Sequence, residues 1–144
     1  MPYATQSDLL QRISLAELTQ LTDDAKVGAP NPAIVAGALE EASGMVETYC
    51  RGRYVTPLQI SDAVTSMTRD ISIYFLFSRR PQKMSETVRQ RYEDAIALLK
   101  DISTGKAALD QPVSAAAPQS TTTDFSTPTT TNLRITDDQI VGFV

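Results

Sequence analysis

The 144-residue sequence contains no histidine, no tryptophan and a single cysteine, Cys50. Without histidine it cannot form a Ser-His-Asp or Cys-His catalytic pair, or a zinc site that includes an imidazole. A single cysteine cannot form an internal disulfide, and the spacing of the six glycines matches neither a phosphate-binding loop nor a dinucleotide fingerprint. These absences argue against most enzyme classes, and we expect no catalytic residue, no metal and no cofactor.

Long apolar runs are also missing. No segment approaches the roughly 20 apolar residues that a membrane-spanning helix needs. The first residues, MPYATQ, lack the basic and apolar regions of a signal peptide. We therefore expect a soluble protein that stays in a reducing cytosol and has no membrane partner.

The charges are unevenly distributed along the chain, whose formal net charge is −4. Residues 1–50 carry 2 basic and 7 acidic side chains, whereas residues 51–106 carry 10 basic and 6 acidic ones. Solvated helix faces would explain this division, and so would a head-to-tail contact between copies, because opposite charges attract across such an interface. The candidate subunit-contact residues are Glu40, Glu41, Glu47, Arg79, Arg80, Arg89 and Arg91.

Capping residues and apolar spacing predict helices throughout the first 106 residues. Ser14 begins an S-x-x-E capping box, Asn31-Pro32 is an N-cap followed by proline, and Ser85 can begin the last helix. The expected helices span residues 6–12, 15–21, 32–51, 62–79 and 85–103. We predict an all-α fold, a small bundle of four to five helices in which the very apolar helix 62–79 is central.

The composition changes after Asp110. Residues 111–132 are rich in Thr, Ser, Pro and Ala and lack the apolar content of a core, whereas residues 133–144 are apolar again. We predict a helical domain at 1–106 and an extended linker and C-terminal arm at 107–144. The last segment either folds back on its own domain or docks on a partner. Its candidate partner-binding residues are Leu133, Arg134, Ile135, Ile140, Val141, Phe143 and Val144.

Asp70 lies next to the apolar face of the expected central helix, where an unpaired carboxylate would be costly. We expect it to form a structural ion pair or cap, with Arg51, Arg53 or Arg79 as the candidate partners. A catalytic carboxylate would need a second titratable group beside it, and the sequence offers no obvious one.

Several segments together resemble the small head–tail connector (neck) proteins of Mu-like phages and prophages. They are Tyr3-Ala4-Thr5-x-x-Asp8-Leu9, Glu17-Leu18-x-Gln20-Leu21-Thr22-Asp23, Glu47-x-Tyr49-x-x-Gly52-Arg53-Tyr54-x-x-Pro57-Leu58, Asp70-Ile71 with Tyr74, and Arg91-Tyr92-Glu93-Asp94-Ala95. The resemblance covers about residues 3–106. It implies a helical connector subunit that forms a ring of twelve copies beneath the portal protein, around a central channel for DNA.

The expected function is that of a non-enzymatic virion structural protein, found in the neck of the virion and in the host cytoplasm during assembly. The expected partners are the portal protein, neighbouring copies in the ring and a tail-side neck or tail-completion protein, with DNA only as the content of the channel. The alternative is a small DNA-binding or regulatory helical protein that uses Arg79, Arg80, Arg89 and Arg91. A sequence pI near 4.7 argues against a dedicated DNA binder.

Overall fold

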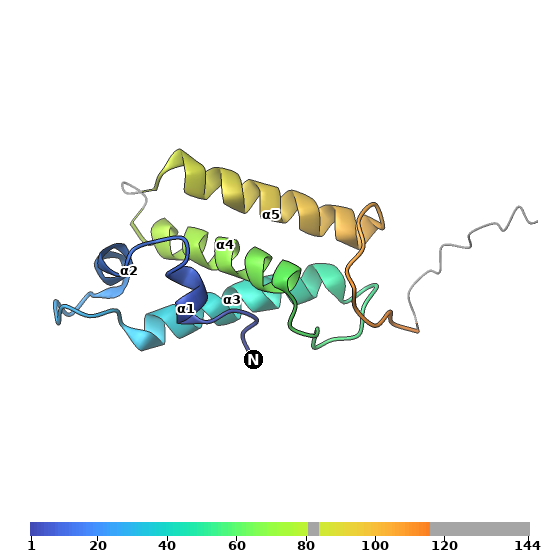
Figure 1. Cartoon of the computed structure of the whole chain (residues 1–144), viewed down its shortest axis with the longest axis horizontal. Helices are drawn as coiled ribbons and strands as arrows, with labels where there is room; N and C mark the ends of the chain where they lie inside the picture. The colour runs from blue at the N-terminus through green and yellow to red at the C-terminus, as the bar shows by residue number, and fades with distance from the viewer. Residues whose placement is uncertain (81–83, 116–144) are drawn as a thin grey trace, which may run out of the picture.

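The structure, a computed structural model, describes residues 1–80 and 84–115 (Figure 1). The helices in this part of the chain are α1 (Gln6–Leu9), α2 (Leu15–Thr22), α3 (Pro32–Cys50), α4 (Asp62–Ser78) and α5 (Glu86–Thr104). The only β-type pairing among the described residues is an isolated bridge between Tyr54 and Val113. The prediction of an all-α fold is therefore confirmed for the described part.

The helix ends follow the capping residues. The Ser14 hydroxyl accepts a hydrogen bond from the Glu17 N–H at 3.1 Å, and the Asn31 side chain accepts one from the Ala33 N–H at 3.0 Å. At the far end of α5, Gly105 adopts a left-handed conformation with φ +88°, which glycine tolerates without strain. Four predicted helices agree with the structure to within one residue at each end.

The first helix is shorter than predicted. We expected it to span residues 6–12, but α1 is a single turn, Gln6–Leu9, and Leu10 is its C-cap. The following turn continues to Ile13, which is buried, so the apolar spacing there reflects burial without an extended helix.

The central helix is α4, as the sequence predicted. It packs against α1, α2, α3 and α5, and α5 and α3 lie on different sides of it (Figure 1). Its buried apolar side chains are Val64, Met67, Ile71, Ile73, Leu76 and Phe77. Because α3 and α5 also contact each other, these three long helices form the framework of the domain.

The core has two parts. One lies between the long helices and includes Val46 and Cys50 of α3, Ile71 of α4 and Leu99 of α5. The other lies where α1 and α2 cover one end of α4, and its largest buried side chains include Leu9, Leu18, Leu21 and Leu76. Cys50 is completely buried, as expected for a small core residue.

Residues 107–115 continue the folded domain beyond the predicted boundary at residue 106. Ala107 and Leu109 pack against the core between the long helices. The Gln111 side chain accepts from the Gln59 N–H at 2.8 Å and donates to the Gln59 carbonyl at 2.9 Å. We call residues 107–115 the strap, because they bind the connection between α3 and α4.

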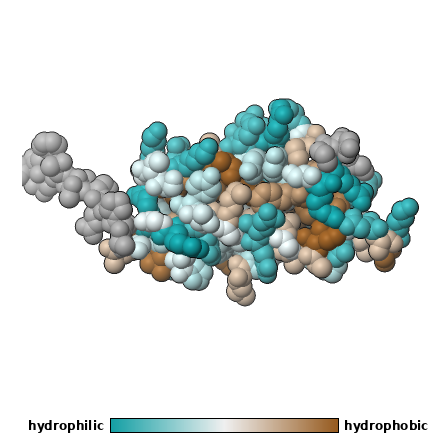
Figure 2. All heavy atoms as spheres, turned by 180° about the vertical axis from the view of Figure 1, so that it is seen from behind, coloured by the Kyte–Doolittle hydropathy of each residue, from teal (hydrophilic) through white to brown (hydrophobic). Residues whose placement is uncertain are grey.

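The surface seen from behind carries hydrophobic side chains in several separate places, surrounded by polar ones (Figure 2). Large exposed apolar side chains come from distant parts of the chain, such as Leu15, Val27, Ile60 and Val113. In the described part, no helix is both long and apolar enough to cross a lipid bilayer.

Candidate functional site

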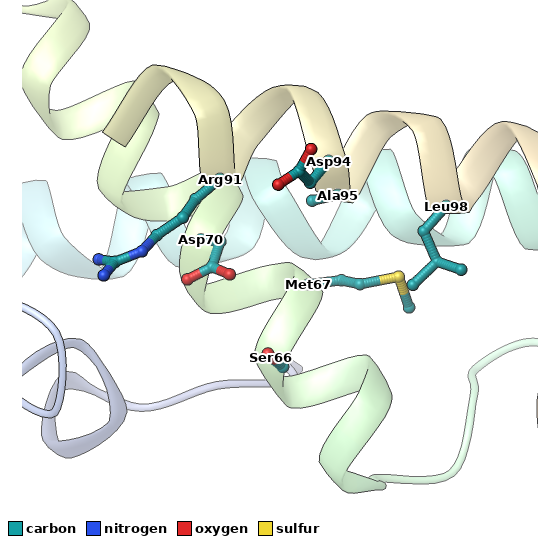
Figure 3. A pocket seen from close by; sticks show the side chains of 7 residues that line it. All are labelled: Ser66, Met67, Asp70, Arg91, Asp94, Ala95 and Leu98. Atoms are coloured by element: carbon teal, nitrogen blue, oxygen red, sulfur yellow. The ribbon is translucent and has the colours of Figure 1, made fainter. Parts of the chain in front are cut away.

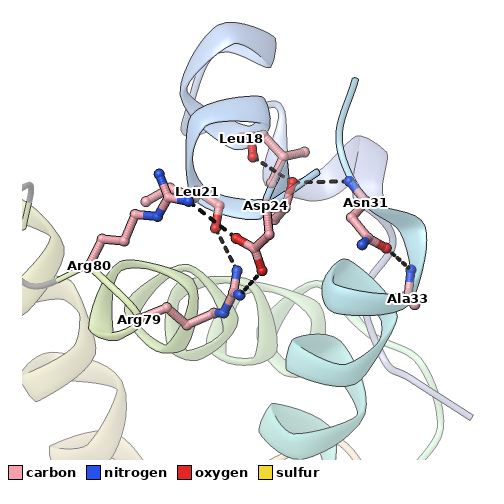
Figure 4. Close-up of polar contacts among 8 residues, drawn as sticks. Leu18, Leu21, Asp24, Asn31, Ala33, Arg79 and Arg80 are labelled. Atoms are coloured by element: carbon pink, nitrogen blue, oxygen red, sulfur yellow. Dashed lines mark hydrogen bonds and ion pairs between the residues drawn. The ribbon is translucent and has the colours of Figure 1, made fainter. Parts of the chain in front are cut away.

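Two of the predicted contact residues, Arg79 and Arg80, are bound within their own chain (Figure 4). Arg79 donates to the Leu21 carbonyl oxygen at 2.7 Å and also to the Asp24 carboxylate. Arg80 donates to the other oxygen of Asp24 at 3.1 Å. The hydrogen bond from Arg79, with a smaller contribution from Arg80, lowers the pKa of Asp24. This cluster, which we call the Arg79 clamp, fastens the end of α4 to the end of α2.

The neighbouring acidic loop is also held by its own side chains. The Asp23 carboxylate accepts the N–H groups of Val27 at 2.9 Å and Gly28 at 2.7 Å. Lys26 and Gly28 have positive φ values of 55° and 85°, which turn the chain back toward Asp23. The described residues contain no group of three or more side chains suited to hold a metal ion.

Arg89 forms a local pair on α5. Its guanidinium contacts both carboxylate oxygens of Glu86, one turn earlier, at 2.9 and 2.7 Å. The two side chains are 55% and 74% exposed, so water screens the pair and its contribution to stability is small.

Arg91 lines a pocket of about 180 Å³ between α4 and α5 (Figure 3). Arg91 and Asp94 project from α5, and Ser66 and Asp70 project from α4 (Figure 3). The rest of the lining is apolar and comes from Met67, Ala95 and Leu98. Arg91 has no ion pair or hydrogen bond to another described residue, so the structure leaves its charge available at the edge of the pocket.

Asp70 does form ion pairs, but its partners differ from those we expected. Its Oδ1 lies 3.6 Å from Nε of Arg69 and 3.8 Å from Nε of Arg12. These separations are too long for hydrogen bonds, so the attraction is electrostatic. Arg53, an expected partner, instead donates to the Ile102 carbonyl at 2.9 Å. The prediction of Arg51, Arg53 or Arg79 as the partner was wrong: the nearer partner is the neighbouring residue on α4, and the other lies in the turn after α1, which packs beside α4.

The acidic candidates lie on α3. The Glu47 carboxylate accepts the hydroxyl of Tyr3, and burial together with this hydrogen bond raises the pKa of Tyr3 to about 12. Glu40 and Glu41 are exposed and make no hydrogen bond or ion pair to another described residue. Glu40 and Glu47 border a hollow of about 310 Å³ whose lining also includes Ser43 and Gly44.

Within one chain, the structure does not bring the acidic and basic candidates together. The partners that it does show are Asp24, the Leu21 carbonyl, Glu86 and Tyr3. Sequence reasoning missed Asp24 and Tyr3, since contacts between residues more than 40 positions apart leave no local pattern. The arm candidates Leu133, Arg134, Ile135, Ile140, Val141, Phe143 and Val144 lie outside the described residues.

Comparison with known proteins places these features in a family. The sequence model of the family described as "Bacteriophage Mu, Gp36" matches residues 3–127. The chain is 34% identical over 108 residues to the Mu-like prophage FluMu protein gp36 of Haemophilus influenzae, covering 74% of each protein. It is 28% identical over 107 residues to Gene product J of Escherichia phage Mu, again covering 74% of each. The chain therefore belongs to the Bacteriophage Mu Gp36 family and is a protein of Mu-like phages.

Proposed function

We propose that the chain is a structural subunit of the phage particle that acts at the junction of head and tail. In this proposal its copies form a ring, of twelve subunits, beneath the portal protein and around the channel for DNA. The observation that carries the proposal is the match to a phage Mu family over residues 3–127. The connector-like motifs around Tyr3, Gly52 and Arg91 fall within that match.

The chemistry of the described residues supports a role without catalysis. Cys50 is buried, which raises the pKa of its thiol to about 11 and keeps it protonated near neutral pH. Of the two carboxylates of the α4–α5 pocket, Asp94 accepts a hydrogen bond from Gln90 at 2.9 Å, and Asp70 lies 3.6 Å from Arg69 and 3.8 Å from Arg12. The hydroxyl groups that contact carboxylates here have structural roles: the Thr5 hydroxyl donates to Asp8 at 2.8 Å at the N-cap of α1, and the Tyr3 hydroxyl donates to Glu47.

The DNA-binding alternative has less support. Binding to a phosphate backbone depends on cations that are free to replace counterions. Of the four arginines proposed for it, Arg79 and Arg80 bind Asp24, and Arg89 binds Glu86. Of these four, Arg91 alone has no hydrogen bond or ion pair to another described residue, and one arginine is too few for a dedicated duplex-binding surface.

The proposed partners are the portal protein, neighbouring copies and a tail-side neck or tail-completion protein, with DNA passing through the ring. Residues 133–144 are proposed to bind a portal subunit or a ring neighbour, because an apolar segment at the end of a polar linker suits a tethered docking peptide. The proposed location is the neck of the virion, reached from the host cytoplasm during assembly.

Co-assembly with the portal protein of the same phage tests this proposal. The full chain and the portal protein are mixed over a range of salt concentrations, and the mass of the product is measured by light scattering. We expect a complex in which several copies of the chain join each portal ring. The absence of co-assembly at every salt concentration would reject the connector function, and tight binding to duplex DNA in a gel-shift titration would favour the alternative.

A further inference from the structure

Three large apolar side chains are exposed on the surface around the strap. Val55, Ile60 and Val113 are 49%, 72% and 60% exposed. The Val55 N–H donates to the Pro112 carbonyl at 2.9 Å, and the residue before Ile60 is bound to Gln111. The strap therefore brings apolar residues of two separate segments to the end of the bundle where α5 ends (Figure 1). We call Val55, Ile60 and Val113 the strap patch.

The strap also has an open backbone edge. It pairs with the chain after α3 in antiparallel fashion, through the isolated β-bridge of Val113. On the inner side, the Pro112 carbonyl accepts the Val55 N–H at 2.9 Å, and the Ser114 N–H donates to the Arg53 carbonyl at 2.9 Å. Because successive residues of such a strand point their N–H and C=O groups to opposite sides, those of Val113 point away from this pairing. Neither group has a hydrogen bond to another described residue.

An open edge beside exposed apolar side chains suits an extended apolar peptide. Such a peptide adds as a strand, in which main-chain hydrogen bonds give affinity and alternate side chains cover apolar surface. Pro112 does not interrupt the outer edge, because the side on which it lacks an N–H faces Val55. The strap patch and the edge at Val113 therefore fit one ligand, a β-strand with apolar side chains.

Residues 133–144 of the same sequence have the chemistry of such a strand. They contain leucine, isoleucine, valine and phenylalanine side chains and no proline. Residues 116–132, which join them to the strap, contain two prolines and one large apolar residue, Phe125. Beyond the strap, the apolar side chains that could cover the patch are thus concentrated in residues 133–144.

The length of the linker favours the edge of a neighbouring copy. The described part ends at residue 115, directly after the open edge. A strand that returns to the edge it has just left needs a loop of only about two to five residues. Residues 116–132 supply 17 residues, which reach about 60 Å when extended. The 19 residues of α3 span about 28 Å, so the linker is long enough to cross from one copy to the next.

We propose that residues 133–144 of one copy add as a strand to the strap edge of the next copy and cover Val55, Ile60 and Val113 there. This inference rests on the proposed ring and names the surface that receives the arm. The edge and the arm are different parts of one chain, so the contact is head-to-tail and forms a ring when the rotation between neighbours closes.

Proline substitutions test both sides of this contact in the full chain. Val113→Pro removes the outward N–H and leaves the inner hydrogen bonds of the strap in place, whereas Ile135→Pro/Val141→Pro interrupts the added strand. Sedimentation velocity over a concentration series compares both variants with the wild type. We expect the wild type to form species larger than a dimer and each variant to associate about tenfold more weakly.

An equal mixture of the two variants tests the direction of the contact. The Ile135→Pro/Val141→Pro variant keeps an intact edge, and the Val113→Pro variant keeps an intact arm. One contact can therefore form between two different chains, but no second contact can extend the pair. We expect the mixture to form dimers and no larger species.

Matched controls separate the contact from a general effect of proline. Ala108→Pro alters an exposed residue of the strap whose N–H has no hydrogen bond to another described residue. Thr121→Pro/Thr129→Pro adds two prolines to the linker. Both controls should associate like the wild type, and circular dichroism should show equal helix content in all variants.

A second variant tests the strap patch without altering the backbone of the edge. Val55→Ser/Ile60→Ser removes two of its apolar side chains and should also weaken association about tenfold. Leu15→Ser/Val27→Ser removes side chains that are 55% and 77% exposed elsewhere on the bundle, and it should leave association unchanged.

Several results would overturn the inference. They are a wild type that stays monomeric at the highest concentration, association that the edge and patch variants leave unchanged, linker prolines that weaken it as much as the arm prolines, and a mixture that forms no dimers. A monomeric wild type that melts at a higher temperature than the arm variant would place residues 133–144 on their own domain and also overturn it. The portal-binding measurement is independent of these. A chain that joins the portal but ignores the edge variants lacks this contact and keeps its connector function, whereas one that self-associates as described but never joins the portal lacks that function.

Discussion

At the scale of single residues, Tyr3 has the densest set of polar contacts near the N-terminus. Its hydroxyl donates to Glu47 and accepts the Leu58 N–H at 2.9 Å. Its backbone N–H donates to the Ser43 hydroxyl at 2.9 Å, and its carbonyl accepts the Thr65 hydroxyl at 3.0 Å. One residue thus joins the N-terminus to α3, to α4 and to the connection between them.

Replacement of this hydroxyl should destabilise the fold. Tyr3→Phe removes the group that satisfies both Glu47 and the Leu58 N–H, and the loss of a buried partner costs about 1–3 kcal/mol. Tyr49→Phe is the control, because the half-buried Tyr49 hydroxyl makes no hydrogen bond to another described residue. Urea denaturation measures both free energies of unfolding. Equal stability of the two variants would contradict the role given to Tyr3.

Stability should also fall at alkaline pH. The pKa is raised to about 12 for Tyr3, from an ordinary value of 10.0, and to about 11 for Cys50, from 9.0. The folded state holds both protons more tightly than the unfolded state, so this stability is fully present below about pH 9 and is lost as pH rises toward 12. Melting temperatures from pH 8 to 12 should decline less steeply for Tyr3→Phe than for the wild type. If the melting temperatures of the two proteins fell equally with pH, the ionisation of Tyr3 would not contribute to the loss of stability.

Capping residues in the sequence predicted where the helices begin, but the sequence did not predict which side chains pair across the fold. Ser14, Asn31 and Ser85 act on groups two or three positions away, so the sequence alone located the helix starts. Arg69, one partner of Asp70, is its neighbour in the sequence, but the approach of Arg12 depends on how the turn after α1 lies against α4, and no spacing within the sequence encodes that packing.

At the scale of elements, the Arg79 clamp explains how the short helix α2 stays attached. An eight-residue helix gains little stability by itself, and its final carbonyl groups need partners. Arg79 supplies one at the Leu21 carbonyl and places positive charge at the C-terminal end of α2, where the helix dipole favours it.

Arg79→Ala should therefore loosen α2 selectively. We expect a loss of about 1 kcal/mol in global stability and faster amide hydrogen exchange in α2 than in α5. Arg89→Ala removes a more exposed arginine of a local pair and should change stability by less than about 0.5 kcal/mol. If the amides of α2 exchanged at the same rate in the wild type and in the Arg79→Ala variant, Arg79 would not hold α2 in place.

The strap gives a second prediction at this scale. A chain that ends at residue 106 loses the packing of Ala107 and Leu109 and both hydrogen bonds of Gln111, about 2–4 kcal/mol in total. A chain that ends at residue 115 keeps them and should melt like the full chain. Thermal denaturation gives the melting temperatures of the full chain and of the two truncated chains. Equal melting temperatures for the chains that end at residues 106 and 115 would contradict this boundary.

The sequence could not locate this boundary, because the change in composition after Asp110 does not coincide with the end of the packed residues. Leu109 is the only large apolar residue between Gly105 and Gln111, and Gln111 is polar, so the pattern does not indicate burial. The bonds between Gln111 and Gln59 join positions 52 residues apart, and only the folded chain brings them together.

At the scale of the whole molecule, the described residues form a helical bundle, and its proposed work is contact with other proteins. Removal of residues 133–144 tests one such contact. If the segment docks on a portal subunit or a ring neighbour, the shortened chain keeps its melting temperature and helix content but attaches more weakly to the portal. A lower melting temperature would show instead that the segment packs on its own domain.

The most direct test of the connector function is the structure of the neck in the native phage particle. Cryo-electron microscopy of that region should show a ring of bundles with the arrangement of α1–α5 next to the portal, enclosing the DNA channel. A complete neck in which every density is accounted for by other proteins would contradict the account.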